Sequence, residues 1–215
     1  MAGVLIDFRT VQLLCSRLCH DLIGPAGAVN AGLEVLEDAA DDDGEAAALV
    51  ADSARQLSGR LAFFRMAFGQ GAGAVASLVQ TRSLAAGLID GNRVTMDWPE
   101  DTYAAGNLPR GGAALILNLI LLSMDSLPRG GELSVRPADL SEGMGIAVTA
   151  KGPGARLRDD IRAAMAADVS SGDLTAHNVH GYFTMRLAES LNTDIEISDD
   201  MKNEVRMAAL MSVGK

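Results

Sequence analysis

Apolar residues recur every three or four positions over the first third of the chain, which is the repeat of an α-helix. From residue 8 to about residue 40 this stripe predicts one long helix with a kink at Pro25. A second stripe over residues 50–68 follows an acidic turn at 41–44 and predicts another helix with a heptad-like seam. Two helices joined by a short connection favour an antiparallel hairpin. Because a lone hairpin leaves much of each seam in water, we expect two chains to pair as a dimeric four-helix bundle.

The helical pattern stops at a glycine-rich stretch over residues 69–74, which is typical of a linker. We therefore expect a helical domain over residues 1–72 and a second domain over residues 73–215. The second domain mixes helical repeats with the alternation of β-strands, so the expected fold class is α+β, with a helical layer on one face of a mixed sheet. The expected helices lie near 77–88, 110–127, 158–167 and 179–191, and the expected strands near 94–98, 133–135, 146–150, 195–197 and 205–211.

Composition and charge narrow the choice of partners. The 215 residues are 48% hydrophobic but only 4% aromatic, which indicates an aliphatic, helix-rich folded protein. The net charge of −10 argues against a nucleic-acid backbone or an anionic membrane as the main partner. The longest aliphatic stretch, 113–122, has about half of the ~20 residues that a bilayer crossing needs, and the first residues do not form a signal peptide. We expect a cytoplasmic protein that acts on proteins or small ligands.

Cysteine and histidine residues offer little sign of a metal site. Cys15 and Cys19 lie one helical turn apart, where a disulfide would strain the helix, so we expect reduced thiols that pack as small apolar residues. A zinc site that joins them to His20 is disfavoured because the sequence offers no matching second pair of ligands. His177 and His180 are interpreted as polar residues near the start of a helix and are assigned no function.

His20 is the most informative residue for chemistry. At about 100° per residue its side chain points about 200° away from Leu18 and Leu22, and hence towards solvent. An exposed imidazole can attack phosphorus through one nitrogen, while the carboxylate of Asp21 orients the ring and fixes its tautomer. Arg17, one turn earlier, could supply positive charge to the phosphoryl oxygens. The His20–Asp21 pair alone is also compatible with His20 being an ordinary surface histidine.

The longer string His-Asp-Leu-Ile-Gly-Pro at 20–25 resembles the phosphoacceptor motif of sensor histidine kinases. The second domain resembles the kinase ATP-binding domain but departs from it at the residues that bind nucleotide. Its Asn box keeps Asn118 and has Leu122 in place of the asparagine that helps to hold magnesium. Ala150 replaces the aspartate that recognises adenine, and the glycine string at 152–154 is interpreted as a turn. The resemblance therefore implies a kinase-like α/β sandwich that has lost nucleotide binding, with no cofactor or metal.

Nearly the full chain is similar to the ChpT-type histidine phosphotransferases of alphaproteobacteria. That resemblance implies a homodimer that relays a phosphoryl group from the receiver domain of a hybrid histidine kinase to response-regulator receiver domains, without using ATP. His20 would carry the phosphoryl group, and Asp21 and Arg17 would assist it. Two alternatives stay open: an ATP-dependent histidine kinase with atypical motifs, against which Leu122 and Ala150 argue, and a non-catalytic dimer that sequesters a regulator, against which the exposed His20 argues.

Overall fold

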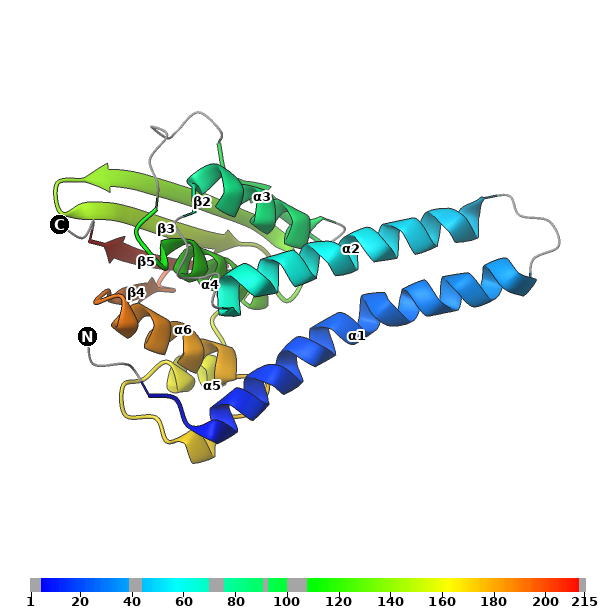
Figure 1. Cartoon of the computed structure of the whole chain (residues 1–215). Coiled ribbons are helices and arrows are strands. Elements are labelled where there is room, and N and C mark those ends of the chain that lie inside the picture. Colours follow the sequence, from blue (N-terminus) through cyan, green and yellow to red (C-terminus); the bar gives the residue numbers. More distant parts are fainter. Residues whose placement is uncertain (1–4, 39–43, 70–75, 91–92, 100–107, 213–215) are drawn as a thin grey trace.

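The computed structural model describes residues 5–38, 44–69, 76–90, 93–99 and 108–212. Two long helices form an antiparallel hairpin whose far end projects away from the rest of the molecule (Figure 1). Residues 41–43 of the predicted turn at 41–44 and residues 70–74 of the predicted linker lie outside the described residues. The elements are α1 (Phe8–Asp38), α2 (Glu45–Phe68), α3 (Leu78–Ile89), β1 (Val94–Asp97), α4 (Gly112–Asp125), β2 (Gly131–Leu140), β3 (Gly143–Lys151), α5 (Asp159–Ala164), a 3-10 turn (Ser171–Asp173), α6 (Val179–Ser190), β4 (Ile195–Ser198) and β5 (Glu204–Met211).

The hairpin follows the predicted helical stripes closely. Helix α1 begins at Phe8, as expected, and runs through Pro25 without interruption. Gly44 precedes helix α2 in a left-handed conformation, with φ of 83°, which glycine adopts without steric cost. Several large apolar side chains of the hairpin remain exposed in the single chain, including Ile23, Leu33, Val35, Leu49 and Leu61. A four-helix bundle needs a second copy of the hairpin and therefore stays a prediction.

The sheet has five strands in the order β1-β2-β3-β5-β4. Strands β1 and β2 are parallel, and the other neighbouring pairs are antiparallel. Helix α4 lies directly on one face of the sheet, with α3 and α6 beside it (Figure 1). The α+β class, the mixed sheet and its one helical layer are thus confirmed.

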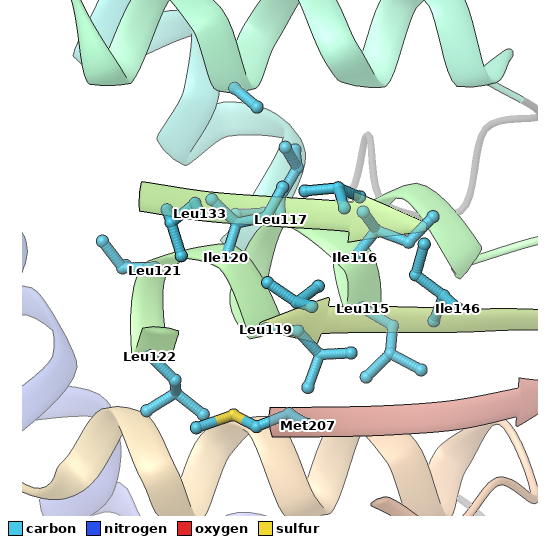
Figure 2. Packing of buried hydrophobic residues seen from close by; sticks show 14 of the residues in the cluster. Leu115, Ile116, Leu117, Leu119, Ile120, Leu121, Leu122, Leu133, Ile146 and Met207 are labelled. Carbon is cyan, nitrogen blue, oxygen red and sulfur yellow. The ribbon is translucent and has the colours of Figure 1, made fainter. Parts of the chain in front are cut away.

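Helix α4 is the centre of the hydrophobic core. Its residues 112–123 are all buried, since α4 contacts the sheet, α2, α3 and α6. Leu122 reaches Met207 of β5 on one side, and other α4 side chains lie near Leu133 and Ile146 of the sheet (Figure 2). A helix that is apolar all round is buried all round, which explains the long aliphatic run.

The base of the hairpin belongs to the same core as the sheet. Phe63, Phe64 and Ala67 of α2 are buried in one cluster with the α4 leucines. Helices α2 and α3 also approach closely at two glycines: a Cβ on Gly59 would lie 2.7 Å from the carbonyl oxygen of Gly87. The division near residue 72 remains a prediction, but across the described residues the hairpin is fixed to the sheet by shared burial.

Candidate functional site

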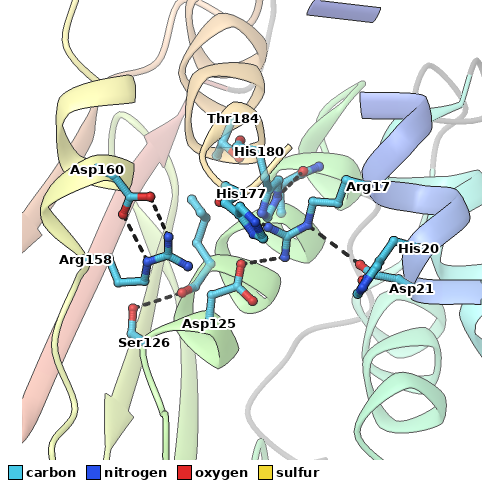
Figure 3. Close-up of polar contacts among 12 residues, drawn as sticks. Arg17, His20, Asp21, Asp125, Ser126, Arg158, Asp160, His177, His180 and Thr184 are labelled. Atoms are coloured by element: carbon cyan, nitrogen blue, oxygen red, sulfur yellow. Dashed lines mark hydrogen bonds and ion pairs between the residues drawn. The ribbon is translucent and has the colours of Figure 1, made fainter. Parts of the chain in front are cut away.

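His20 projects from helix α1 with 88% of its side chain exposed. Its Nδ1 atom lies 3.3 Å from the Oδ1 atom of Asp21 (Figure 3). A carboxylate can only accept a hydrogen bond, so this contact requires the proton on Nδ1. The Nε2 atom then keeps its lone pair, which makes it the nucleophilic nitrogen.

Asp21 is held by two arginines. Its side chain is 24% exposed, and its Oδ2 atom lies 3.7 Å from the Nε atom of Arg17. The Nη1 atom of Arg60, on α2, donates to the backbone oxygen of Asp21 at 3.1 Å. The structure therefore brings together the three predicted site residues, His20, Asp21 and Arg17, with Arg60 as an additional member.

Arg17 connects this site to the C-terminal part of the chain, residues 108–212, for which the name second domain is kept. Its Nη2 atom donates to the Oδ2 atom of Asp125 at 2.7 Å, and its Nη1 atom donates to the carbonyl oxygen of His177 at 3.4 Å. Only 16% of the Arg17 side chain is exposed. The guanidinium thus faces Asp125 and Asp21 rather than standing free beside the ring of His20 (Figure 3).

Asp125 is a site residue that sequence reasoning missed. It is the last residue of α4 and the only charged residue of that helix. Burial raises the pKa of the Asp125 carboxyl, and the charge and hydrogen bond of Arg17 oppose that rise. A cleft of about 500 Å³ opens beside this pair, and Asp21, Arg60 and Arg93 also line it.

His180 is a second residue whose environment the sequence did not reveal. His180 lies at the start of α6, as expected, but only 1% of it is exposed. Its Nε2 atom lies 2.9 Å from the Oδ1 atom of Asn118, and its ring lies against that of Phe68. Burial lowers the pKa of the His180 imidazole well below its ordinary value, and the charge of Arg17 lowers it further. His180 is therefore a neutral structural residue.

The residues at the positions that the resemblance associates with nucleotide binding lie in the core. Leu122 and Ala150 are both completely buried, so neither side chain faces a ligand site. The glycine string at 152–154 lies in a turn, as predicted. The side chains at these positions pack in the core between α4 and the sheet.

Cys15 and Cys19 are free thiols, but both are exposed, so the expectation that they pack as apolar residues is wrong for the single chain. No group of three or more His, Cys, Asp and Glu side chains in the described ranges is arranged to hold a metal ion. Within those same ranges, none of the helices combines the length and the hydropathy needed to cross a membrane.

Comparison with known proteins places the chain beside phosphotransferases in sequence and in structure. Residues 78–203 match the family described as the histidine phosphotransferase C-terminal domain. The chain is 35% identical over 192 residues to protein phosphotransferase ChpT of Brucella abortus (strain 2308), covering 86% of this chain and 88% of that protein. The solved structure of a bacterial phosphotransferase superposes with a TM-score of 0.80 and 33% identity, over 95% of this chain and 97% of that one. Similarity to the histidine kinase AdeS of Acinetobacter baumannii is weaker, with 12% identity over 91% and 98% of the two chains and a TM-score of 0.47.

Proposed function

This chain belongs to the histidine phosphotransferase family, and from that premise we propose that His20 is the residue that carries the phosphoryl group. Membership makes the protein a ChpT-type histidine phosphotransferase of a phosphorelay. The observation that supports His20 is its exposed ring, whose Nδ1 atom faces the carboxylate of Asp21 at 3.3 Å. His180, in contrast, is buried and cannot meet a partner protein.

The geometry supports a simple transfer step. The lone pair of His20 Nε2 attacks the phosphorus of an aspartyl phosphate on a donor protein, and a new N–P bond forms. The P–O bond to the donor carboxyl breaks, and that carboxylate leaves with the electron pair. The ring keeps its Nδ1 proton and becomes a phosphorylated imidazolium, which the negative charge of Asp21 stabilises. In the reverse direction, an acceptor carboxylate attacks the phosphorus and Nε2 recovers its lone pair.

The partners follow from this chemistry. We propose that the donor is the receiver domain of a hybrid histidine kinase and that the acceptors are response-regulator receiver domains, all in the cytoplasm. The exposed ring of His20 is open to a macromolecular partner. We also propose that the protein acts as a homodimer, because large apolar side chains of the hairpin are exposed in the single chain. The exposed fractions are 69% for Ile23, 54% for Leu49 and 50% for Leu61.

The test is transfer from a phosphorylated receiver domain to the full-length protein. A receiver domain of a hybrid kinase from the same genome is labelled on its aspartate and mixed with the protein, and we expect a phosphorylated species that survives alkali and is lost in acid. His20→Ala should abolish it. His177→Ala, which removes another exposed histidine, should not. Label on His20→Ala would show that another residue is the carrier, and failure with every such receiver domain would overturn the proposed function.

A further inference from the structure

We propose that Asp125, in the second domain, is a positioning residue for phosphotransfer: it holds Arg17 against Asp21 and so fixes the carboxylate that orients His20. The inference rests on the proposed function, because it concerns the same site. It also gives the second domain a direct part in the chemistry although its nucleotide positions are filled by core residues. Asp125 touches neither the phosphoryl group nor the ring, so its effect passes through Arg17.

The contacts form one continuous series across two elements. The Oδ2 atom of Asp125 lies 2.7 Å from Arg17 Nη2, Arg17 Nε lies 3.7 Å from Asp21 Oδ2, and Asp21 Oδ1 lies 3.3 Å from His20 Nδ1. The guanidinium is planar and rigid, so the nitrogen bound by Asp125 fixes the direction of the nitrogen that faces Asp21. Displacing Arg17 at one end therefore releases Asp21 at the other.

The series is shielded enough to hold a defined geometry. The side chains of Arg17, Asp21 and Asp125 are 16%, 24% and 25% exposed, whereas a typical surface ion pair is open to solvent and contributes little. Asp125 ends a helix whose preceding residues, 112–123, are all buried. The carbonyl of His177 gives Arg17 a second anchor from a separate part of the second domain. A group mounted on a rigid element positions its neighbours better than one on a loop.

Asp125→Asn tests this role because it keeps the size of the side chain and removes its charge. Full-length protein is treated with phosphoramidate, a small donor that needs no docking surface: the P–N bond to ammonia breaks as His20 Nε2 bonds to phosphorus. We expect Asp125→Asn to form phosphohistidine roughly 10- to 100-fold more slowly, as a misplaced catalytic geometry does. Asp125→Glu should recover part of the rate.

Asp199→Asn is the matched control. Asp199, in the loop after β4, pairs with Arg162 of α5, so its substitution removes a more exposed ion pair without touching Arg17. We expect a wild-type rate from this variant. Melting curves of all variants show that the compared proteins are folded.

A second measurement separates positioning from general stability. The ¹⁵N spectrum of the His20 ring reports which nitrogen carries the proton, and His20→Gln assigns its signals. We expect wild-type protein to hold the proton on Nδ1 and Asp125→Asn to populate both tautomers, whereas Asp199→Asn should match wild type. A wild-type rate and a wild-type ring spectrum in Asp125→Asn, while His20→Ala is inactive, would overturn the role of Asp125 alone. If phosphoramidate labels the wild type elsewhere than His20, the proposed function fails, and the ring spectrum still decides the role of Asp125.

Discussion

The Nε2 atom of His180 lies 2.9 Å from the Oδ1 atom of Asn118 in the interior of the protein. The amide nitrogen of Asn118 donates to the carbonyl oxygens of Ala67 at 2.9 Å and Ala114 at 2.8 Å, so the amide oxygen is left to accept from His180. One side chain on α4 thereby links the end of α2 to the start of α6. The asparagine that resembles a nucleotide-binding residue serves here as a structural link between the hairpin and the second domain.

Asn118→Ala should destabilise the protein by about 2–4 kcal/mol, because it leaves the Ala67 carbonyl and the His180 ring without partners in the core. The measurement is the free energy of unfolding in urea. Asn30→Ala, at an exposed asparagine of α1, is the control and should change that free energy by less than about 0.5 kcal/mol. Equal effects from the two variants would contradict the structural role of Asn118.

His180 should make stability depend on pH below neutrality. Because the pKa of His180 is lowered in the folded state, the unfolded state binds the extra proton first once pH falls below about 6.5. The free energy of unfolding should then fall by up to about 1.4 kcal/mol per pH unit from this group, and it should be unaffected by His180 above neutrality. His180→Gln should lose less stability than wild type between about pH 7.5 and about pH 5.5. Parallel curves for the two proteins would refute the prediction.

The protein should not bind ATP, with or without magnesium. Leu122 and Ala150 are buried in the core, and neither side chain could coordinate a metal or accept from adenine. Isothermal titration calorimetry on the full chain measures this, with an ordinary histidine kinase as the positive control. Magnesium-dependent heat that saturates at kinase-like ATP concentrations would favour the alternative of an atypical kinase.

Most of the fold could be predicted because its signals are local. The aliphatic run that became α4 and the alternation of Leu133 and Val135 in β2 identify their elements from neighbouring residues alone. The string around His20 is local as well. The exposure of the His20 side chain follows from helical geometry, and the structure confirms that exposure.

The contacts of the site could not be predicted in the same way. Arg17 and Asp125 are 108 positions apart, and their meeting depends on how the hairpin packs on the second domain. His180 did carry a weak signal, because Thr184 and Ala188 follow at intervals of four and form the same buried face of α6. A polar residue on such a face indicates a buried hydrogen bond rather than a surface position.

Leu61→Asp should convert the proposed dimer into a folded monomer. Leu61 is 50% exposed in the single chain, so a charge there costs the isolated fold little but prevents burial between two hairpins. The measurement is the mass in solution by light scattering, together with a thermal melt. Val79→Asp places the same charge on a 74% exposed apolar residue of α3, outside the hairpin, and should leave the mass unchanged. A wild-type monomer at micromolar concentration would contradict the four-helix bundle.

Asp21 should affect the rate of transfer without being indispensable. General acid–base catalysis commonly contributes about 10²- to 10⁴-fold to a rate, and a carboxylate that only orients the nucleophile contributes part of that. Asp21→Asn should therefore slow phosphohistidine formation and leave a measurable rate. The variant should remain folded, because the amide has the same size as the carboxylate and Arg17 keeps its ion pair with Asp125. Single-turnover transfer from a phosphorylated receiver domain, followed on phosphate-affinity gels, gives both the rate and its half-saturating concentration. We expect the rate to fall while that concentration stays constant, since Asp21 orients the nucleophile rather than the partner. A higher half-saturating concentration at an unchanged rate would instead show that Asp21 belongs to the docking surface.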